Sequence, residues 1–287
     1  MELTIIKIGG SVITHKNSNV PSINKENVEI VAQQLKTLAG EQAGRFLIIH
    51  GVGSYGHPIV KATGIHEGIR EQSQIFAFAQ TQKLQNELNC IVVEALQGVG
   101  IPAFPCQISN SAVMENGRLI EFDLTAIRGM LDLGIVPVGF GVPAYDRITG
   151  CSILSGDQSA PYFALKLKAS KIIVASDVGG IYTKDPKIHA DARFIETVDP
   201  ADSISLERSL GGSIDIDVTG GMKQKYLELA AVARAGISSR IVLFTQLADA
   251  LSGGNVGTKI NAANNKSGKS AELFETATVA NQEETQV

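Results

Sequence analysis

The first stretch with residue types suited to chemistry is "KIGGSVITHK", near the amino terminus. Lys7 lies inside an apolar run, Gly9 and Gly10 follow it, and Lys16 comes shortly after. A lysine in an apolar strand needs a partner for its charge, and paired glycines let backbone N–H groups approach an anion closely. The stretch therefore predicts an anion site, although an edge-strand lysine before a tight turn would have the same residues.

The second stretch, "HGVGSYGHP", has the same construction. Gly51 and Gly53 follow a strand-like apolar run, and His57 lies where a helix should begin. The free N–H groups and the positive end of a helix dipole would then point into one space, where a phosphate binds well. A lone histidine is more often a satisfied core residue, but its place behind this loop favours a ligand contact.

Three further stretches occur in the C-terminal half: "SILSGDQ", "SDVGGIYTKDP" and "DVTGGMKQK". Each alone is explained by a helix cap and a turn. Together with the first two they supply glycine-rich turns and several lysines at the ends of strands. Open parallel sheets bind ligands at the carboxyl ends of their strands, so we expect these turns to converge.

Two common nucleotide motifs are excluded. No stretch matches GxxxxGK[ST], so the site is not a P-loop. "GVGSYG" has GxGxxG spacing, but it follows the second strand, and Glu71 is the only acidic candidate about twenty residues further on. A nicotinamide enzyme is therefore disfavoured.

The elements that position these turns alternate along the chain. Six apolar runs with little polar alternation predict strands buried on both faces: 3–8, 46–50, 102–104, 135–138, 171–175 and 240–244. Helical patterns occupy 24–38, 72–96, 124–133, 158–167 and 222–235, with Asp123 and Asp157 as expected N-caps. The prediction is an α/β fold, a three-layer αβα sandwich around a central, mostly parallel open sheet.

Composition limits the class of protein. The chain has 287 residues, 44% of them hydrophobic, and a net charge of −4. It contains no apolar run of membrane-spanning length, secretory signal or basic stripe, so we expect a cytoplasmic protein with neither membrane nor nucleic acid as partner. Cys90, Cys106 and Cys151 lack the spacing of a disulfide framework or zinc site, and no metal-ligand set is predicted. We expect one domain over 1–263 and a polar, disordered tail over 264–287.

The five stretches, in order, resemble the amino acid kinase superfamily, and most closely its isopentenyl phosphate kinase branch. The resemblance extends from about Leu3 to Ile260, and "GSYGHP", "VKATGIHEG", "ENGRLIEFDL" and "SILSGDQ" are particular to that branch. It implies transfer of a phosphoryl group from ATP to isopentenyl phosphate, with Mg²⁺ and a homodimeric assembly. The half up to about residue 150 would bind the acceptor, and the half from about 151 to 263 the nucleotide.

The resemblance also implies roles for individual residues. Lys7 and Lys16 would contact the phosphates, His57 would hold the acceptor phosphate and Asp157 would organise the lysines. The implied nucleotide contacts are Gly9, Gly10, Asp177, Gly180, Tyr182, Lys184, Thr219, Gly220, Gly221 and Lys225. The implied acceptor contacts, besides His57, are Gly51, Val52, Gly53, Ser54, Phe76 and Gly156. Among these, Gly9, Gly10, Gly51 and Gly53 would offer backbone N–H groups.

The chemistry of phosphates explains why cations and amides are needed. Two like charges about 4 Å apart repel by roughly 4 kcal/mol at an effective dielectric near 20. The second pKa of a phosphate monoester is about 6, so at neutral pH the acceptor oxygen is already ionised and a protein base is unnecessary. His57 is therefore interpreted as a hydrogen-bond donor rather than a base.

The acceptor tail should be short and apolar, and Phe76, with Ile75, Phe78 and Ala79, is a candidate lining or else ordinary core. Three residues depart from the family pattern: Val52, Val142 and Gly179. A β-branched Val52 would resist positive φ and reshape the loop.

Two other functions remain open at this stage. "AFPCQIS" has a faint likeness to kinases of the phosphonate fosfomycin, and Val52 would fit a nucleotide or metabolite sensor that has lost turnover.

Overall fold

The computed structural model describes residues 2–15, 17–36, 45–184, 186–199 and 221–262. The expected tail, 264–287, lies outside these residues, as do Lys16, Thr219 and Gly220. The extent of the single domain stays a prediction.

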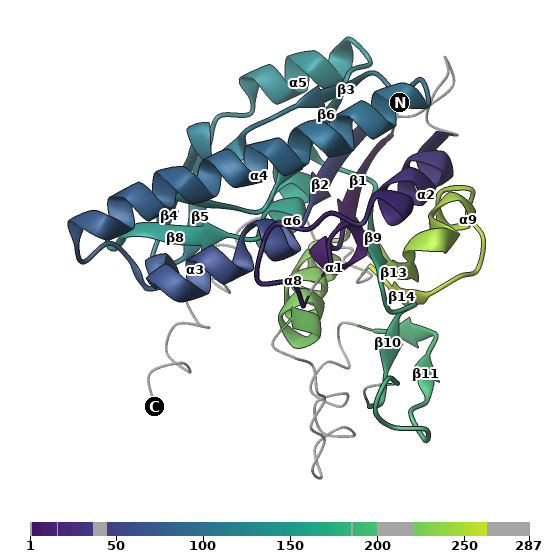
Figure 1. Ribbon diagram of the computed structural model, residues 1–287. Coiled ribbons are helices and arrows are strands. Elements are labelled where there is room, and N and C mark those ends of the chain that lie inside the picture. Colours follow the sequence, from purple (N-terminus) through teal and green to yellow (C-terminus); the bar gives the residue numbers. More distant parts are fainter. Residues whose placement is uncertain (1, 16, 37–44, 185, 200–220, 263–287) are drawn as a thin grey trace.

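Eight of the described strands form the central sheet, in the order β12-β14-β13-β9-β1-β2-β6-β3 (Figure 1). All neighbours are parallel except β13 and β14, which are antiparallel. The six predicted strands are all present in this sheet. The bounds are β1 Leu3–Ile8, β2 Arg45–His50, β3 Ala103–Pro105, β6 Val136–Phe140, β9 Lys171–Ser176, β12 Thr197–Val198, β13 Ser238–Leu243 and β14 Thr258–Ile260.

Helices cover both faces of this sheet, as the predicted three-layer sandwich requires (Figure 1). One layer contains α2 Lys25–Leu35, α4 Gln72–Gly98 and α9 Leu247–Leu251, and the other contains α5 Thr125–Asp132, α6 Gly156–Leu167 and α8 Gly221–Arg234. This distribution follows from right-handed crossovers, because the chain moves one way along the sheet through α2 and α4 and returns through α5, α6 and α8. No described helix is both long and apolar enough to cross a bilayer.

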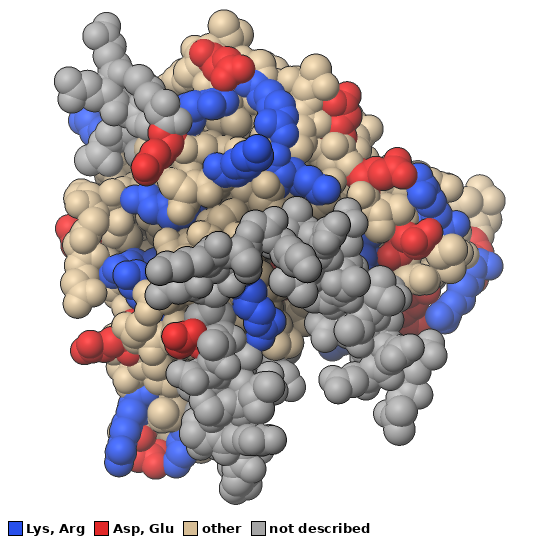
Figure 2. Space-filling model, turned by 180° about the vertical axis from the view of Figure 1, so that it is seen from behind, with Lys and Arg blue, Asp and Glu red and all other residues tan. Residues whose placement is uncertain are grey.

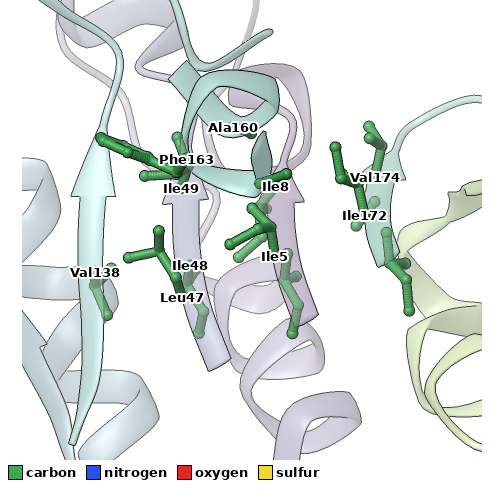
Figure 3. Close-up of a cluster of buried hydrophobic side chains, with 14 of the residues drawn as sticks. Ile5, Ile8, Leu47, Ile48, Ile49, Val138, Ala160, Phe163, Ile172 and Val174 are labelled. Carbon is green, nitrogen blue, oxygen red and sulfur yellow. The ribbon is translucent and has the colours of Figure 1, made fainter. Parts of the chain in front are cut away.

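The core lies where α6 packs on the central strands. Phe163 and Ala160 of α6 lie over Ile49 of β2 and Ile8 of β1, and all four are at most 1% exposed (Figure 3). Strands buried on both faces have continuous apolar sequences, which is why these runs could be predicted.

A second sheet was not predicted from the sequence. It has the order β5-β4-β7-β8, with β4 Ala112–Glu115, β5 Arg118–Phe122, β7 Val142–Asp146 and β8 Gly150–Leu154. A separate hairpin pairs β10 Ile181–Tyr182 with β11 Phe194–Ile195. Short segments complete the description: α1 Gly10–Ile13, α3 His57–Thr63, η2 Gly53–Tyr55, η3 Ile65–Glu67, η4 Ile108–Asn110 and η6 Phe244–Gln246.

Both predicted N-caps were wrong by one or two positions. Ser155 caps α6 and accepts a hydrogen bond from the N–H of Gln158, so Asp157 lies inside the first turn. The residue before α5 is Leu124, while Asp123 accepts from the N–H of Thr125.

Charged side chains of both signs occupy the surface. On the face seen from behind, Lys and Arg gather in the upper part, with Asp and Glu around them (Figure 2). The expected absence of a nucleic-acid partner stays a prediction.

Candidate active site

A cavity of about 510 Å³ opens at the carboxyl ends of β1, β2 and β9. Lys7 and His57 both line it, although one lies in β1 and the other begins α3. Most of the site residues named from the sequence meet here: Lys7, Gly9, Gly10, Gly51, Val52, Gly53, His57, Gly156, Asp157, Asp177, Gly180, Tyr182, Lys184 and Lys225.

Lys7 lies in the middle of the sheet, not at its edge. β1 pairs with β2 on one side and with β9 on the other, and Lys7 is 5% exposed. Its charge is balanced by Asp157, with Nζ–Oδ1 at 2.8 Å. The neighbouring Gly156 lies against two side chains of this region: a Cβ there would lie 3.2 Å from Cγ2 of Ile49 and at an ordinary 3.4 Å from Cε of Lys7.

Asp157 holds a second lysine from α8. Nζ of Lys225 lies 2.6 Å from the same Oδ1. Burial raises the pKa of Asp157, but the two lysines outweigh it and lower the pKa to about 2. Burial and the charge of Lys7 lower the pKa of Lys225 to about 8, against the opposing effect of Asp157. The cluster therefore contains two cations and one anion.

The two glycine loops pack backbone against backbone. A Cβ on Gly10 would lie 2.6 Å from the nitrogen of Gly53, and a Cβ on Gly51 would lie 2.5 Å from the nitrogen of Gly10. Gly53 has φ +44 and its missing Cβ would collide with Thr14. Thr14 joins the loops, because its hydroxyl donates to the carbonyl of Gly10 (2.8 Å) and accepts from the N–H of Ser54 (3.2 Å). Glycines are thus required here for close approach of the chain to itself.

Two of the four expected amide donors are used within the fold. The N–H of Gly9 donates to the carbonyl of Ala175, and the N–H of Gly51 donates to that of Ile8, both at 2.8 Å. The expectation that these two groups face a phosphate is therefore wrong, since they extend the hydrogen bonding of the sheet. For Gly10 and Gly53 the expectation stays a prediction.

His57 is the first residue of α3 and is exposed where it lines the cavity. Val52, in the loop before His57, has φ −110. Its backbone is therefore not left-handed, and the β-branched side chain does not force the loop out of shape. Val142 is buried at the start of β7, and a Cβ on Gly179 would meet Leu243 at an ordinary 3.7 Å.

Asp177 directly follows β9, whereas the glycine loop that begins at Gly51 follows β2, on the other side of β1. Its carboxylate accepts from the Ser11 hydroxyl (2.8 Å) and from Nζ of Lys187 (2.8 Å). Burial raises its pKa, but these two hydrogen bonds, the charge of Lys187 and a backbone hydrogen bond together lower the pKa below its ordinary value. Lys184 pairs with Asp191, and Tyr182 packs edge-on against Phe194 with ring centroids 5.3 Å apart.

Two proposed acceptor contacts do not line the cavity. Phe76 is 72% exposed on α4, so it forms neither the pocket nor the core, and Ile75 is 49% exposed. Ser54 is buried and exchanges hydrogen bonds with the backbone of Ser22. Gly221 begins α8.

The cavity also contains residues that sequence reasoning missed. The lining includes Val60, Gln85 and Ile153, and near Asp177 it includes Ser11 and Lys187. Gln85 is 2% exposed, and it belongs to a row of buried polar residues on α4 with Thr81 and Asn89. That spacing of four residues is a readable signal for one helix face, whereas Val60 and Ile153 resemble ordinary core residues.

Among the described residues, no group of three His, Cys, Asp or Glu side chains could hold a metal ion. Asp157 and Asp177 are both engaged by lysines. The described part of the chain therefore contains no preformed magnesium cage.

The sequence profile of the amino acid kinase family matches residues 2–243. The chain belongs to this family. It is 37% identical to the isopentenyl phosphate kinase of Methanothermobacter thermautotrophicus, over 84% of this chain and 90% of that protein. It is 35% identical to the isopentenyl phosphate kinase of Methanocaldococcus jannaschii, over 78% of this chain and 85% of that one. An X-ray structure of isopentenyl phosphate kinase superposes with a TM-score of 0.78 at 34% identity, over 90% of this chain and all of the other.

Proposed function

We propose that this amino acid kinase transfers the γ-phosphoryl group of ATP to isopentenyl phosphate, giving isopentenyl diphosphate and ADP. The observation that carries the proposal is a single cavity. It is lined by the Lys7, Lys225 and Asp157 cluster and also by His57 and the two glycine loops. The likeness to isopentenyl phosphate kinases supports the choice of acceptor.

In the proposed reaction, an ionised oxygen of the acceptor phosphate attacks the γ-phosphorus. The bond from that phosphorus to the β–γ bridging oxygen breaks, and ADP leaves with the bonding electrons. No proton must be removed from the nucleophile, because a monoester with a second pKa near 6 is mostly dianionic at neutral pH.

The chain's contribution is to bind and neutralise. Lys7 and Lys225 offset the repulsion between two polyanions, and Asp157 holds both ammonium groups at one point. His57 donates to a nonbridging oxygen of the acceptor, and the amides of Gly10 and Gly53 face the phosphates. The implied contacts of Lys16, Thr219 and Gly220 concern positions outside the described residues.

The two ends of the cavity differ, which supports the expected division into an acceptor half and a nucleotide half. Val60, which follows His57 on α3, and Ile153 of β8 offer apolar lining for a five-carbon tail. Asp177, Gly180, Tyr182, Lys184 and Lys187 follow β9, and we assign this part of the lining to ATP.

We further propose Mg²⁺ as the ion that accompanies ATP, a homodimeric assembly and a cytoplasmic location, all on the likeness to the family. Magnesium keeps several waters and commonly reaches a site through substrate phosphates, so a protein cage is not required for it. The mass of the protein in solution tests the dimer.

The deciding experiment is ATP turnover, coupled to ADP detection, over a panel of small monophosphates with isopentenyl phosphate first and the phosphonate fosfomycin as competitor. We expect the highest kcat/KM for isopentenyl phosphate and a diphosphate product by ³¹P NMR. A higher kcat/KM for fosfomycin would show that the proposed acceptor is wrong. Absence of acceptor-dependent ATP turnover would favour a sensor.

A further inference from the structure

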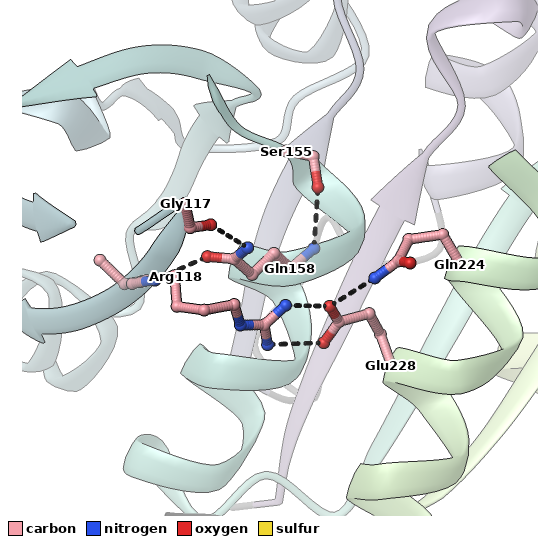
Figure 4. A network of polar contacts seen from close by, with 7 residues as sticks. Gly117, Arg118, Ser155, Gln158, Gln224 and Glu228 are labelled. Atoms are coloured by element: carbon pink, nitrogen blue, oxygen red, sulfur yellow. Dashed lines mark hydrogen bonds and ion pairs between the residues drawn. The ribbon is translucent and has the colours of Figure 1, made fainter. Parts of the chain in front are cut away.

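The turn between β4 and β5 lies against two helices of the candidate active site. Asn116 and Gly117 form the turn and both have positive φ, 48 and 77. Gln158 of α6 makes two hydrogen bonds to the turn. Its Nε2 donates to the carbonyl of Gly117 (3.0 Å), and its Oε1 accepts from the N–H of Leu119 (2.7 Å) (Figure 4). The N–H of Gly117 donates to buried Asp146 (2.8 Å). The turn is therefore fixed to α6 by a single side chain.

The same turn reaches the neighbouring helix α8 through Arg118. Its Nη1 and Nη2 lie 2.5 and 3.2 Å from Oε1 and Oε2 of Glu228 (Figure 4). The Glu228 side chain is 6% exposed, and Gln224 donates a further hydrogen bond to it at 3.0 Å. A two-pronged pair of this kind fixes orientation as well as distance.

These are the two helices whose charges meet in the cavity. Gln158 directly follows Asp157 on α6. Glu228 lies three residues after Lys225 on α8, so the two side chains are neighbours on one helix face. Arg118 therefore holds α8 one turn away from the contact between Lys225 and Asp157.

We propose that Arg118 is a positioning residue: its paired hydrogen bonds to Glu228, with Gln158 at the base of the same turn, set α8 against α6 and so keep Lys225 on Asp157. The inference rests on the proposed kinase function, in which Lys225 acts on the phosphates. It adds that the β4–β5 hairpin, which belongs to the acceptor half of the chain, sets the geometry of a lysine in the nucleotide half.

The competing explanation is that the pair only stabilises the fold. Replacing both partners distinguishes a pair that only stabilises the fold from a pair that also positions α8. Removing one partner strands a buried charge, whereas replacing both with apolar residues of similar size is often neutral for stability. The double replacement therefore restores the fold without restoring the orientation.

The experiment compares Arg118→Met, Arg118→Met/Glu228→Met and the wild type in kcat, in KM for ATP and isopentenyl phosphate, and in urea unfolding. We expect the single variant to be destabilised and the double variant to regain most of that stability. We expect kcat of the double variant to stay at least about 10-fold below wild type with KM for isopentenyl phosphate within about 2-fold, because the hairpin is bonded to α8 and α6, whereas His57 begins α3.

A second readout does not depend on turnover. The pKa of Lys225, followed by NMR of its side chain, should rise from about 8 toward 10.5 in the double variant as the ammonium leaves its buried place beside Lys7 and Asp157. Arg118→Lys keeps the positive charge but loses the two parallel hydrogen bonds to Glu228. It should raise the pKa of Lys225 to a smaller degree, and it provides the test if the methionine variants fail to fold.

Arg147→Met is the matched control, because Arg147 pairs with Glu121 at the surface of the same sheet and is 44% exposed. It should leave kcat and the pKa of Lys225 unchanged. A stable double variant with wild-type kcat and an unshifted Lys225 pKa would overturn the proposal, and so would an Arg118→Lys variant unchanged in both. An inactive wild type would instead refute the proposed function, while the NMR readout would still test the role of Arg118.

Discussion

Lys7 and Lys225 contact the same oxygen of Asp157, at 2.8 and 2.6 Å. Lys7 comes from a central strand and Lys225 from a helix in the layer above it, and both are less than a tenth exposed. Because two cations share one anion, a phosphate entering the cavity meets a net positive charge that has already been removed from water. This preorganisation is the largest single source of rate enhancement in many enzymes.

Asp157→Asn should destabilise the protein and remove most activity. Two buried ammonium groups lose their counter-charge, and breaking a buried pair costs about 3–5 kcal/mol. Urea unfolding at neutral pH measures the loss, and ATP turnover measures the effect on activity.

The same variant has a pH signature. The pKa of Asp157 is about 2 in the folded state and 3.8 ordinarily, because Lys7 and Lys225 outweigh the effect of burial. A lowered folded-state pKa stabilises the fold above the ordinary value, and this stabilisation disappears as the pH falls through about 2. The stability difference between wild type and Asp157→Asn should therefore shrink over that interval. A difference that stays constant would contradict the assignment.

Activity should decline on the alkaline side as Lys225 loses its proton. Burial and the nearby charge of Lys7 place its pKa near 8, so kcat should fall as the pH rises through this value. Lys225→Arg keeps a positive charge to above about pH 12 and should lack this alkaline limb, though with a lower kcat at neutral pH. An identical limb in both proteins would assign the titration to another group.

The inner strands of the central sheet, such as β1 and β2, could be predicted from sequence because they are buried on both faces and mostly apolar, whereas the short strands β12 and β14 were not predicted. The second sheet could not, since β4 has only four residues and β5 has a single buried residue, Leu119. The glycine loops were recognisable as strand ends, but their packing against each other was not, because contacts between distant segments leave no local pattern. Arg118 and Glu228 illustrate the same limit: each is an ordinary charged residue until the fold brings them together.

His57→Ala should reduce transfer to isopentenyl phosphate by about 100-fold or more, the range found when one donor to a developing charge is removed. His57→Gln retains a donor and should keep part of the activity. Steady-state kinetics at neutral pH with saturating ATP separates the two. Full activity of His57→Ala would refute its role.

Gly10→Ala tests the packing of the two loops. Its Cβ would lie 2.6 Å from the nitrogen of Gly53 and 3.0 Å from that of Val52, and backbone atoms there have no room to move aside. We expect a loss of about 1–3 kcal/mol in the free energy of unfolding, together with reduced turnover. Gly129→Ala, in α5 with open space around it, is the control and should be neutral or stabilising by up to about 1 kcal/mol. Equal effects of the two substitutions would show that the loops tolerate separation.

Ile153→Ala should widen the cavity where we place the acceptor tail, because Ile153 is one of its apolar lining residues. One methylene in an apolar pocket is worth about 1–3 kcal/mol of discrimination, so kcat/KM for longer prenyl monophosphates should rise about 10-fold relative to isopentenyl phosphate. Phe76→Ala is the control, since Phe76 is 72% exposed and lies outside the cavity. The comparison requires only the ratio of kcat/KM for two acceptors in each variant. If the kcat/KM ratio changed in Phe76→Ala but not in Ile153→Ala, the acceptor tail would lie against α4 rather than in the cavity.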